Sequence, residues 1–131
     1  MPRLDTPIIF EVVGRPPYVS LWIDGVQADG TLLQTSLSDG TNDRQVSGTY
    51  DAVAGVIKFN DAEFPGLILT TTFFTANAIP LADGTVQSFV GSWTDQEITF
   101  EKTPKGKGHR MLRVRQLTGN WMAIHPQKPI Q

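Results

Sequence analysis

The sequence contains no cysteine, and that absence removes several kinds of chemistry together. Disulfide bonds, thiolate nucleophiles and cysteine-ligated zinc or iron–sulfur centres all require this residue. Histidine is nearly as scarce, because His109 and His125 are the only two and lie sixteen residues apart. A histidine-based metal site needs a closer pair with further ligands. We therefore expect neither a metal ion nor a cofactor.

Long apolar runs are missing as well. No stretch approaches the ~20 apolar residues that cross a bilayer, and Asp5 and Glu11 interrupt the segment where a secretion signal would have its apolar core. The chain also lacks a G-x-S-x-G elbow and a glycine-rich phosphate loop ahead of a helix. These absences favour a cytoplasmic location without membrane contact. They give no support to hydrolase or nucleotide-dependent chemistry.

Helical patterning is absent too, whereas strand patterning runs along the whole chain. No window of about eleven residues keeps an apolar helical stripe, while β-branched and aromatic residues recur between turn pairs such as Asp24-Gly25 and Asp83-Gly84. We predict one all-β domain over residues 1–131, an antiparallel up-and-down barrel of about eight strands. The predicted strands cover residues 8–13, 18–23, 31–37, 44–51, 55–59, 67–75, 85–94, 97–102, 110–117 and 120–125.

A pattern of glycine, small polar residue and aromatic occurs three times, at Gly48–Tyr50, Gly91–Trp93 and Gly119–Trp121. Glycine within a strand allows close approach of a neighbouring backbone, as a small barrel needs at its corners. An aromatic two residues later lies on the same face and can fill the space beside the glycine. We predict that residues 48–59 and 91–100 form related hairpins, each with a short turn, and that the third copy starts a strand.

This pattern resembles the calycins, the group that includes lipocalins, fatty-acid-binding proteins and avidins. Within that group, residues 48–55, GTYDAVAG, are most similar to an avidin strand in which Gly-Thr-Tyr precedes a short turn. The resemblance implies an up-and-down barrel with an interior cavity. It also implies that Tyr50 points into the barrel and hydrogen-bonds the polar head of a ligand.

Acidic residues are missing from the end of the chain. Residues 102–131 carry seven bases and no acid, net +7, whereas residues 1–101 carry thirteen acids and four bases, net −9. Such asymmetry indicates an anionic partner, or pairing of opposite charges within the fold or between protomers. Because no aromatic interleaves with these bases, the pattern does not favour nucleic acid. Strand alternation leaves two placements open for Arg113 and Arg115: outside the barrel, or inside it and holding an anion.

The leading functional hypothesis is binding of a small, largely apolar molecule inside the barrel. The predicted ligand-binding residues are six aromatic side chains and a histidine at the end of the last strand: Tyr18, Trp22, Tyr50, Phe73, Trp93, Trp121 and His125. Aromatic residues in that number are equally compatible with the ordinary core of a filled barrel.

Two alternatives stay open beside this hypothesis. One is a cofactor-free cyclase, isomerase or hydratase acting on a hydrophobic, polyketide- or lipid-like substrate. Its candidate acids and bases are Tyr50, Tyr18, Glu11 and Asp51. The other is an oligomeric assembly module or a carbohydrate-binding module, in which the acidic and basic regions of different protomers meet.

Overall fold

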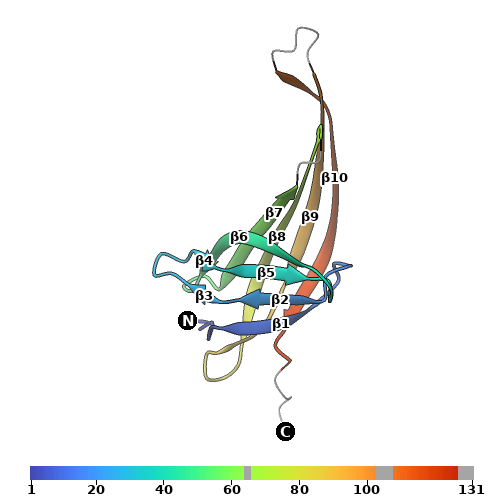
Figure 1. The fold of residues 1–131 in the computed structure, drawn as a ribbon. Coiled ribbons are helices and arrows are strands. Elements are labelled where there is room, and N and C mark those ends of the chain that lie inside the picture. Colours follow the sequence, from blue (N-terminus) through green and yellow to red (C-terminus); the bar gives the residue numbers. More distant parts are fainter. Residues whose placement is uncertain (64–65, 103–107, 127–131) are drawn as a thin grey trace.

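The computed structural model describes residues 1–63, 66–102 and 108–126, and these residues form strands and no helix. The strands are β1 (Ile8–Val13), β2 (Ser20–Ile23), β3 (Gly25–Val26), β4 (Leu32–Leu33), β5 (Thr35–Ser38), β6 (Asp43–Asp51), β7 (Val56–Glu63), β8 (Ile68–Pro80), β9 (Val86–Lys102) and β10 (His109–Ile124). Eight of them close into an antiparallel barrel in the order β1-β10-β9-β8-β7-β6-β5-β2 (Figure 1). β3 and β4 form a separate two-stranded sheet. The predicted all-β class and closed antiparallel barrel are confirmed.

Side chains from alternate positions fill the barrel interior. Phe10, Phe74 and Phe89 are completely buried there. The Trp121 ring packs edge-on against Phe59 and Phe74, with ring centroids 5.6 and 5.2 Å apart. Full burial of a large apolar side chain stabilises the fold by about 1.5–3 kcal/mol. The hydrophobic core therefore runs along the barrel axis.

Two copies of the glycine–aromatic pattern pair with each other across β9 and β10. The register sets Gly91 opposite Trp121 and Gly119 opposite Trp93. A Cβ on Gly119 would lie 2.3 Å from the Trp93 ring. The Trp121 indole crosses Gly91, and its N–H donates to the Thr75 and Ser92 carbonyl oxygens at 3.2 and 3.0 Å. The predicted close packing at the glycines is confirmed, but each aromatic comes from the neighbouring strand.

Of the two predicted hairpins, the first is confirmed and the second is wrong. β6 turns through residues 52–55 into β7, with Tyr50 opposite Ile57. β9, by contrast, runs without interruption through Asp95, and β10 runs through Gly119. Acidic residues are depleted in strands, which is why residues 94–97 resemble a turn. In the structure the Asp95 carboxylate has an arginine partner, so the strand tolerates it.

Segments outside the strands close both ends of the barrel. At one end the Tyr50 hydroxyl donates to the Pro2 carbonyl oxygen at 2.7 Å, and the Arg3 backbone N–H donates to Gly84 at 2.7 Å. At the other end the connection from β1 to β2, residues 14–19, lies across the opening, and the Trp93 indole N–H donates to its Gly14 carbonyl oxygen at 3.0 Å. We call this second end the fork mouth, because the long strands leave the barrel there.

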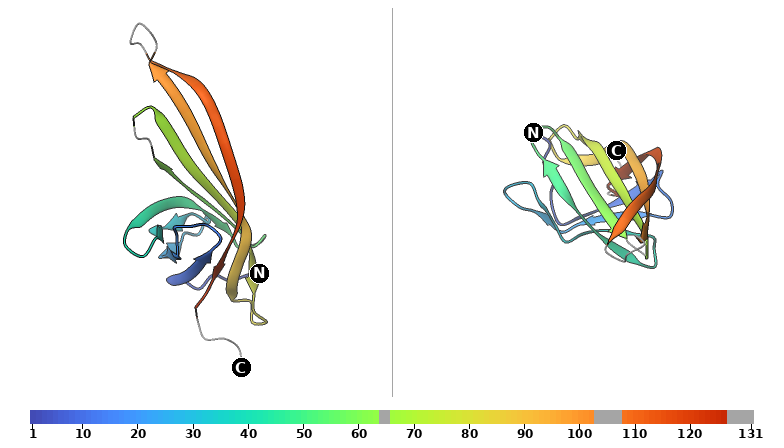
Figure 2. Two further views of the ribbon diagram at one scale, coloured as in Figure 1. Left: turned by 90° about the vertical axis from the view of Figure 1, so that its right-hand side faces the viewer. Right: turned by 90° about the horizontal axis from the view of Figure 1, so that it is seen from above.

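β8, β9 and β10 continue past the fork mouth as an arm, defined here as residues 68–71, 96–102 and 109–118. The end of β7 pairs with the base of the arm, with Ala62 opposite Thr71 and Glu63 opposite Thr70. Figures 1 and 2 show the arm rising from the barrel, with the β9–β10 hairpin farthest from it. β1 pairs with β10 at residues 122–124, so among the described residues no strand lies beside the free edge of β10 along the arm. Residues 103–107 of the basic segment lie outside the described residues.

Gly91→Ala is expected to destabilise the barrel. A Cβ on Gly91 would lie 1.9 Å from the Thr75 carbonyl oxygen, which is backbone and moves only with β8. Overpacking of this kind costs about 1–3 kcal/mol. Chemical denaturation measures the loss, and the control Ser92→Ala, at the next position on the outer face, is expected within about 0.5 kcal/mol of the wild type. Equal stability of the two variants would contradict the close approach.

Candidate functional site

The polarity of the sheet faces reverses where the arm leaves the barrel. Within the barrel, the inner face of β8, β9 and β10 is apolar and carries Phe74, Phe89 and Trp121. The outer face of the same strands is polar and carries Thr75, Ser92 and Asn120, which lie side by side in the register. This is the alternation expected when one face of a sheet is buried and the other is solvated.

Along the arm the inner face carries charged side chains beside Ile68 and Leu117, which are 39% and 64% exposed. The outer face carries an apolar row of three residues beyond the polar Gln96 and Gln116. On the inner face, Glu97 lies opposite Arg115, and their side chains form an exposed ion pair at 4.0 Å. On the outer face, Leu69, Ile98 and Val114 form one row, because Ile98 is the register partner of both other residues. Val114 is 46% exposed. We call Leu69, Ile98 and Val114 the apolar row.

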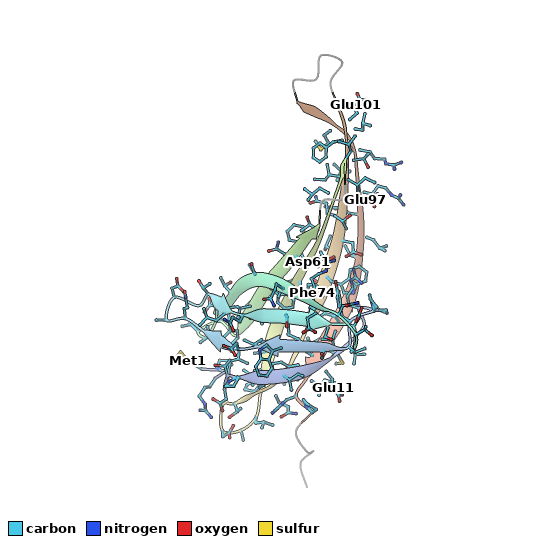
Figure 3. All side chains as sticks on the ribbon, in the orientation of Figure 1. Met1, Glu11, Asp61, Phe74, Glu97 and Glu101 are labelled. Atoms are coloured by element: carbon cyan, nitrogen blue, oxygen red, sulfur yellow. The ribbon has the colours of Figure 1, made fainter. Side chains whose placement is uncertain are left out.

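Arg113 and Arg115 lie outside the barrel, which is the first of the two placements that the sequence left open, although Val114 between them does not face the core. They share a strand face with Trp121, which is the inner face, but they lie on the arm and outside the barrel cavity. Both side chains are exposed. Figure 3 shows the charged side chains that continue outward along this part of the molecule, with Glu97 labelled.

A hollow of about 290 Å³ lies on the outer face of the barrel, close to the arm. Phe73, which is 45% exposed, forms one wall of it. The outward-pointing residues around Phe73 are polar: Thr49, Lys58, Asn60, Thr75, Ser92 and Thr94. An exposed aromatic ring in a hollow is a more specific feature than an isolated surface residue, because it offers a shaped contact.

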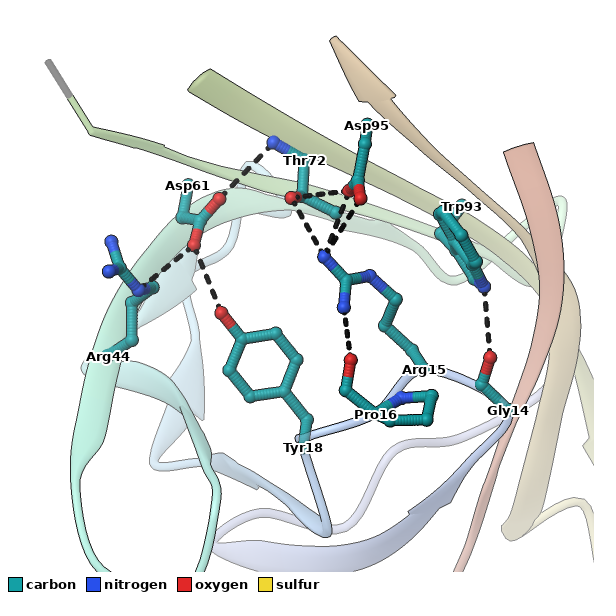
Figure 4. A network of polar contacts seen from close by, with 9 residues as sticks. All are labelled: Gly14, Arg15, Pro16, Tyr18, Arg44, Asp61, Thr72, Trp93 and Asp95. Carbon is teal, nitrogen blue, oxygen red and sulfur yellow. Dashed lines mark hydrogen bonds and ion pairs between the residues drawn. The ribbon is translucent and has the colours of Figure 1, made fainter. Parts of the chain in front are cut away.

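At the fork mouth an ion pair joins residues 14–19 to the inner face of β9 (Figure 4). The Arg15 guanidinium donates to both carboxylate oxygens of Asp95 at 3.0 and 3.1 Å, and the Thr72 hydroxyl donates to Asp95 at 2.8 Å. The guanidinium also lies 4.9 Å from the centroid of the Trp93 ring and 5.5 Å from that of Tyr18. An arginine between two aromatic faces and a carboxylate is held in one position.

A second ion pair closes the gap where β7 separates from β6. The Arg44 Nε lies 3.2 Å from a carboxylate oxygen of Asp61, whose side chain is almost completely buried. Asp61 also accepts from the backbone N–H of Thr72 at 3.3 Å and from the Tyr18 hydroxyl at 3.5 Å. We call the two ion pairs with Tyr18, Thr72 and Trp93 the mouth network.

The contacts of the mouth network act as a latch, in the sense that they fix residues 14–19 in place across the end of the barrel. Both of its carboxylates, Asp61 and Asp95, are paired with an arginine at 3.2 Å or less. Burial, and to a smaller degree the Asp61 carboxylate, raises the pKa of Tyr18 above its usual value near 10. Its hydroxyl therefore stays protonated at neutral pH and serves as a donor. The arrangement holds residues 14–19 against β7, β8 and β9.

The structure divides the predicted ligand-binding residues among several places. Tyr50 points into the barrel as predicted, but its hydroxyl is used by Pro2 and its ring packs edge-on against Phe89 at 5.9 Å. Trp121 also lies in the core. Tyr18 and Trp93 meet at the fork mouth on either side of Arg15.

The remaining three predicted residues lie away from the interior cavity. Trp22 and Phe73 point outward and are 37% and 45% exposed, so neither lines the interior. The reason is strand parity, since both alternate with buried neighbours. His125 lies at the end of the barrel opposite the fork mouth, with its Nδ1 3.2 Å from the Ile9 carbonyl oxygen.

The two carboxylates proposed as an acid or base do not form a site with the tyrosines. Asp51 follows Tyr50 in β6, and its charge adds to the burial that raises the pKa of Tyr50, but its side chain is on the opposite, exposed face of the strand. Glu11 lies on the outer face of β1 and is exposed (Figure 3). Asp51 accepts from the backbone N–H groups of Val53 and Ala54 at 2.9 and 3.0 Å, so it caps the turn between β6 and β7. Asp51 therefore has a local structural role, and no contact assigns a role to Glu11.

Sequence reasoning missed Arg15, Asp61, Thr72 and Asp95. Arg15 and Asp95 are 80 positions apart, and no spacing rule connects residues at that distance. A signal was present in part, because Asp95 and Glu97 are acids at alternate positions within a segment that otherwise favours strand. Such a pattern indicates a strand whose one face is polar.

No protein-family model matches the chain, and no curated protein or solved structure shows significant similarity to it. The calycin resemblance therefore stands at the level of a closed eight-stranded antiparallel barrel. In the described part of the chain, no group of three or more acidic or histidine side chains is arranged to hold a metal ion. Nor do the described residues contain a helix of the length and apolarity needed to cross a bilayer.

Arg15→Gln is expected to lower the free energy of unfolding by about 1–3 kcal/mol, because Asp95 would keep a partly buried carboxylate without its cation. The matched control is Arg3→Gln, which removes an ion pair to Asp5 whose two side chains are 56% exposed. That change is expected to cost less than about 1 kcal/mol. Denaturant titration of both variants measures the difference. Equal losses would show that the mouth network does not act as a latch.

The two tyrosines of the chain are expected to ionise above pH 10 in the folded protein. Burial is the main cause that raises the pKa of both Tyr18 and Tyr50. Because the folded state holds these protons more tightly, the associated stability is complete below the unfolded pKa and is lost as pH rises through the folded pKa. Ultraviolet absorbance follows tyrosinate formation, and Tyr18→Phe and Tyr50→Phe assign the two steps. Midpoints at the value of the unfolded chain would refute the expectation.

Proposed function

We propose that the chain is an assembly module that forms a homodimer through the outer face of its arm. The observation that carries this proposal is the reversal of polarity at the fork mouth. A sheet face with a continuous apolar row is normally covered by a second layer. The core of this chain lies on the opposite face of the same strands, so it gives the apolar row no cover.

The face of the arm is a better contact surface than its edge. An unpaired strand edge is a template for strand addition, and charged side chains on that strand oppose such pairing. β10 carries Arg113 and Arg115 along its free edge. The apolar row has no comparable protection, and burying an apolar side chain there contributes up to about 1.5–3 kcal/mol.

The charge distribution favours a second copy as the partner. Six of the seven bases in residues 102–131 fall within residues 102–115, while residues 1–101 have net charge −9. The arm carries residues 109–115 away from their own barrel (Figure 1). Two copies that lie in opposite directions bring the basic end of each beside the acidic barrel of the other. The same patch on both subunits then forms a closed, symmetric contact.

The other two hypotheses receive less support from the contacts. A ligand inside the barrel would have to displace aromatic side chains such as Phe89 and Trp121, which are buried. Segments at residues 1–7 and 14–19 also close the two ends through specific hydrogen bonds. An enzyme at the fork mouth would use carboxylates that are already paired with arginines. Assembly uses the surface that the fold leaves uncovered.

Ile98→Asp is expected to weaken the homodimer by roughly tenfold or more, because a carboxylate would be buried in the apolar row without a cation. Sedimentation velocity over a range of protein concentrations gives the dissociation constant. We expect a dimer for the wild-type chain and a monomer for the variant at the same concentration.

Val53→Asp is the matched control for that experiment. Val53 is 79% exposed on the turn between β6 and β7, so the same change of charge there should leave the dimer intact. Added salt should weaken the wild-type dimer, because it screens the attraction between the basic and acidic regions. A wild-type chain that stays monomeric at all concentrations would refute the proposed function.

A further inference from the structure

The hollow beside Phe73 lies on the same outer face as the apolar row, and Phe73 is four positions from Leu69 along β8. Outward-pointing residues cross β8, β9 and β10 in successive rows. From the barrel toward the tip these rows are Thr75–Ser92–Asn120, Phe73–Thr94–Thr118, Thr71–Gln96–Gln116 and Leu69–Ile98–Val114. Thr71 is already buried in the single chain, at 8% exposure, so Gln96 and Gln116 form the accessible part of its row. A row with two glutamines thus separates the hollow from the apolar row.

We infer that two copies pack outer face to outer face with opposite strand directions, about a two-fold axis at the row Thr71–Gln96–Gln116, so that the partner's Leu69 enters the hollow beside Phe73. The inference rests on the proposed function and adds the register of the contact. In such a packing each strand lies over the same strand of the partner. Phe73 of each chain then faces Leu69 of the other, because the two residues lie two positions on either side of the axis.

The hollow beside Phe73 supports this register because it lies next to the arm and has an exposed aromatic wall, whereas a second hollow on the same face, lined by residues such as Val90 and Asn120, lies farther from the arm. Facing sheets pack closely when the side chains of one fit between those of the other. The hollow measures about 290 Å³, room for an aliphatic side chain, and the exposed ring of Phe73 gives that side chain an apolar wall. The partner's Leu69 covers Phe73, and the reciprocal contact is formed at the same time.

The glutamine row supports the same axis. A glutamine amide is both donor and acceptor, so Gln96 on a two-fold axis can pair with its own copy. An axis two positions nearer the tip, at Ile98, would instead set Gln96 opposite Phe100 and leave the polar amide without a partner. It would also leave Phe73 uncovered. A polar pair inside an apolar contact is a known means of fixing register.

The charges agree with this arrangement. Opposite strand directions carry the segment beyond Ile98 of one chain toward the barrel of the other. That segment leads to the basic residues 102–115, and the barrel carries most of the acids of the chain. With parallel strand directions, the basic ends of the two chains would lie together and repel each other.

Cross-linking through single cysteines tests the register, because the native chain has no cysteine. In the inferred dimer, the cysteine of Gln96→Cys lies beside its own copy, within reach of a short bifunctional thiol reagent, since facing sheets are about 10 Å apart. Val90→Cys is the matched control, also on the outer face of β9 and 41% exposed. It lies six positions from the axis, so its copy is about 40 Å away at ~3.3 Å per residue. We expect covalent dimer from Gln96→Cys and none from Val90→Cys.

Sedimentation velocity of the cysteine variants shows whether a dimer forms at all, which separates the proposed dimer from its inferred register. A further variant, Ile98→Cys, lies within the arm: if the chain dimerises and Ile98→Cys cross-links in preference to Gln96→Cys, the register is wrong and assembly through the arm still stands. Preferential cross-linking of Val90→Cys would place the axis on the barrel and overturn both. If no dimer forms, both are overturned.

Phe73→Ala provides a second test without cysteine. It should weaken the dimer by roughly tenfold, because the partner's Leu69 loses its apolar wall. Trp22→Ala removes an exposed aromatic from the outer face of β2 and should leave the dissociation constant unchanged. An unchanged constant for Phe73→Ala would show that the hollow is not part of the contact.

Discussion

The continuity of β9 and β10 is the constraint on which the rest of the structure depends. Side chains of a strand alternate with a period of two, and the alternation carries on from the barrel into the arm. Trp121 fixes which positions of β10 point inward, and the same parity then places Arg115 on the inner face and Val114 on the outer face. Beyond the fork mouth, inward and outward positions continue to alternate, but the types of residue that occupy them change. The apolar row therefore lies on the face away from the barrel core, and among the described residues Val114 is exposed while Leu69 and Ile98 are half-buried.

The mouth network lies at the point where this change of polarity occurs. There the core ends at Trp93, and the next inward positions, Asp95 on β9 and Thr72 on β8, are polar. Arg15 and Arg44 neutralise the carboxylates at that level, and residues 14–19 cover the end of the core. A polar belt of this kind ends the core without leaving a buried carboxylate unpaired.

The sequence was sufficient to predict the strands and the barrel, because alternation and turn chemistry are local signals. It divided β9 and β10 into two strands each, since a residue such as Asp95 acquires its partner only from the tertiary fold. The prediction that aromatic residues lie in the interior is right for Tyr50 and Trp121. It is wrong for Trp22 and Phe73, because strand parity buries their neighbours instead. The arm escaped prediction altogether, because no local pattern tells how far a strand continues after its neighbours have ended. The opposite net charges of the two regions were visible, but their separation in space was not.

Because β9 and β10 leave the barrel as a ladder joined by one connection, the length of the arm is independent of the barrel register. Inserting two residues into each strand beyond Phe100 and Met111, where β8 no longer pairs with β9, would preserve parity and every contact of the core. The interior volume therefore limits changes in the barrel, and the length of the arm can be altered separately. The fold thus combines a barrel of fixed interior volume with an arm whose length can change in steps of two residues.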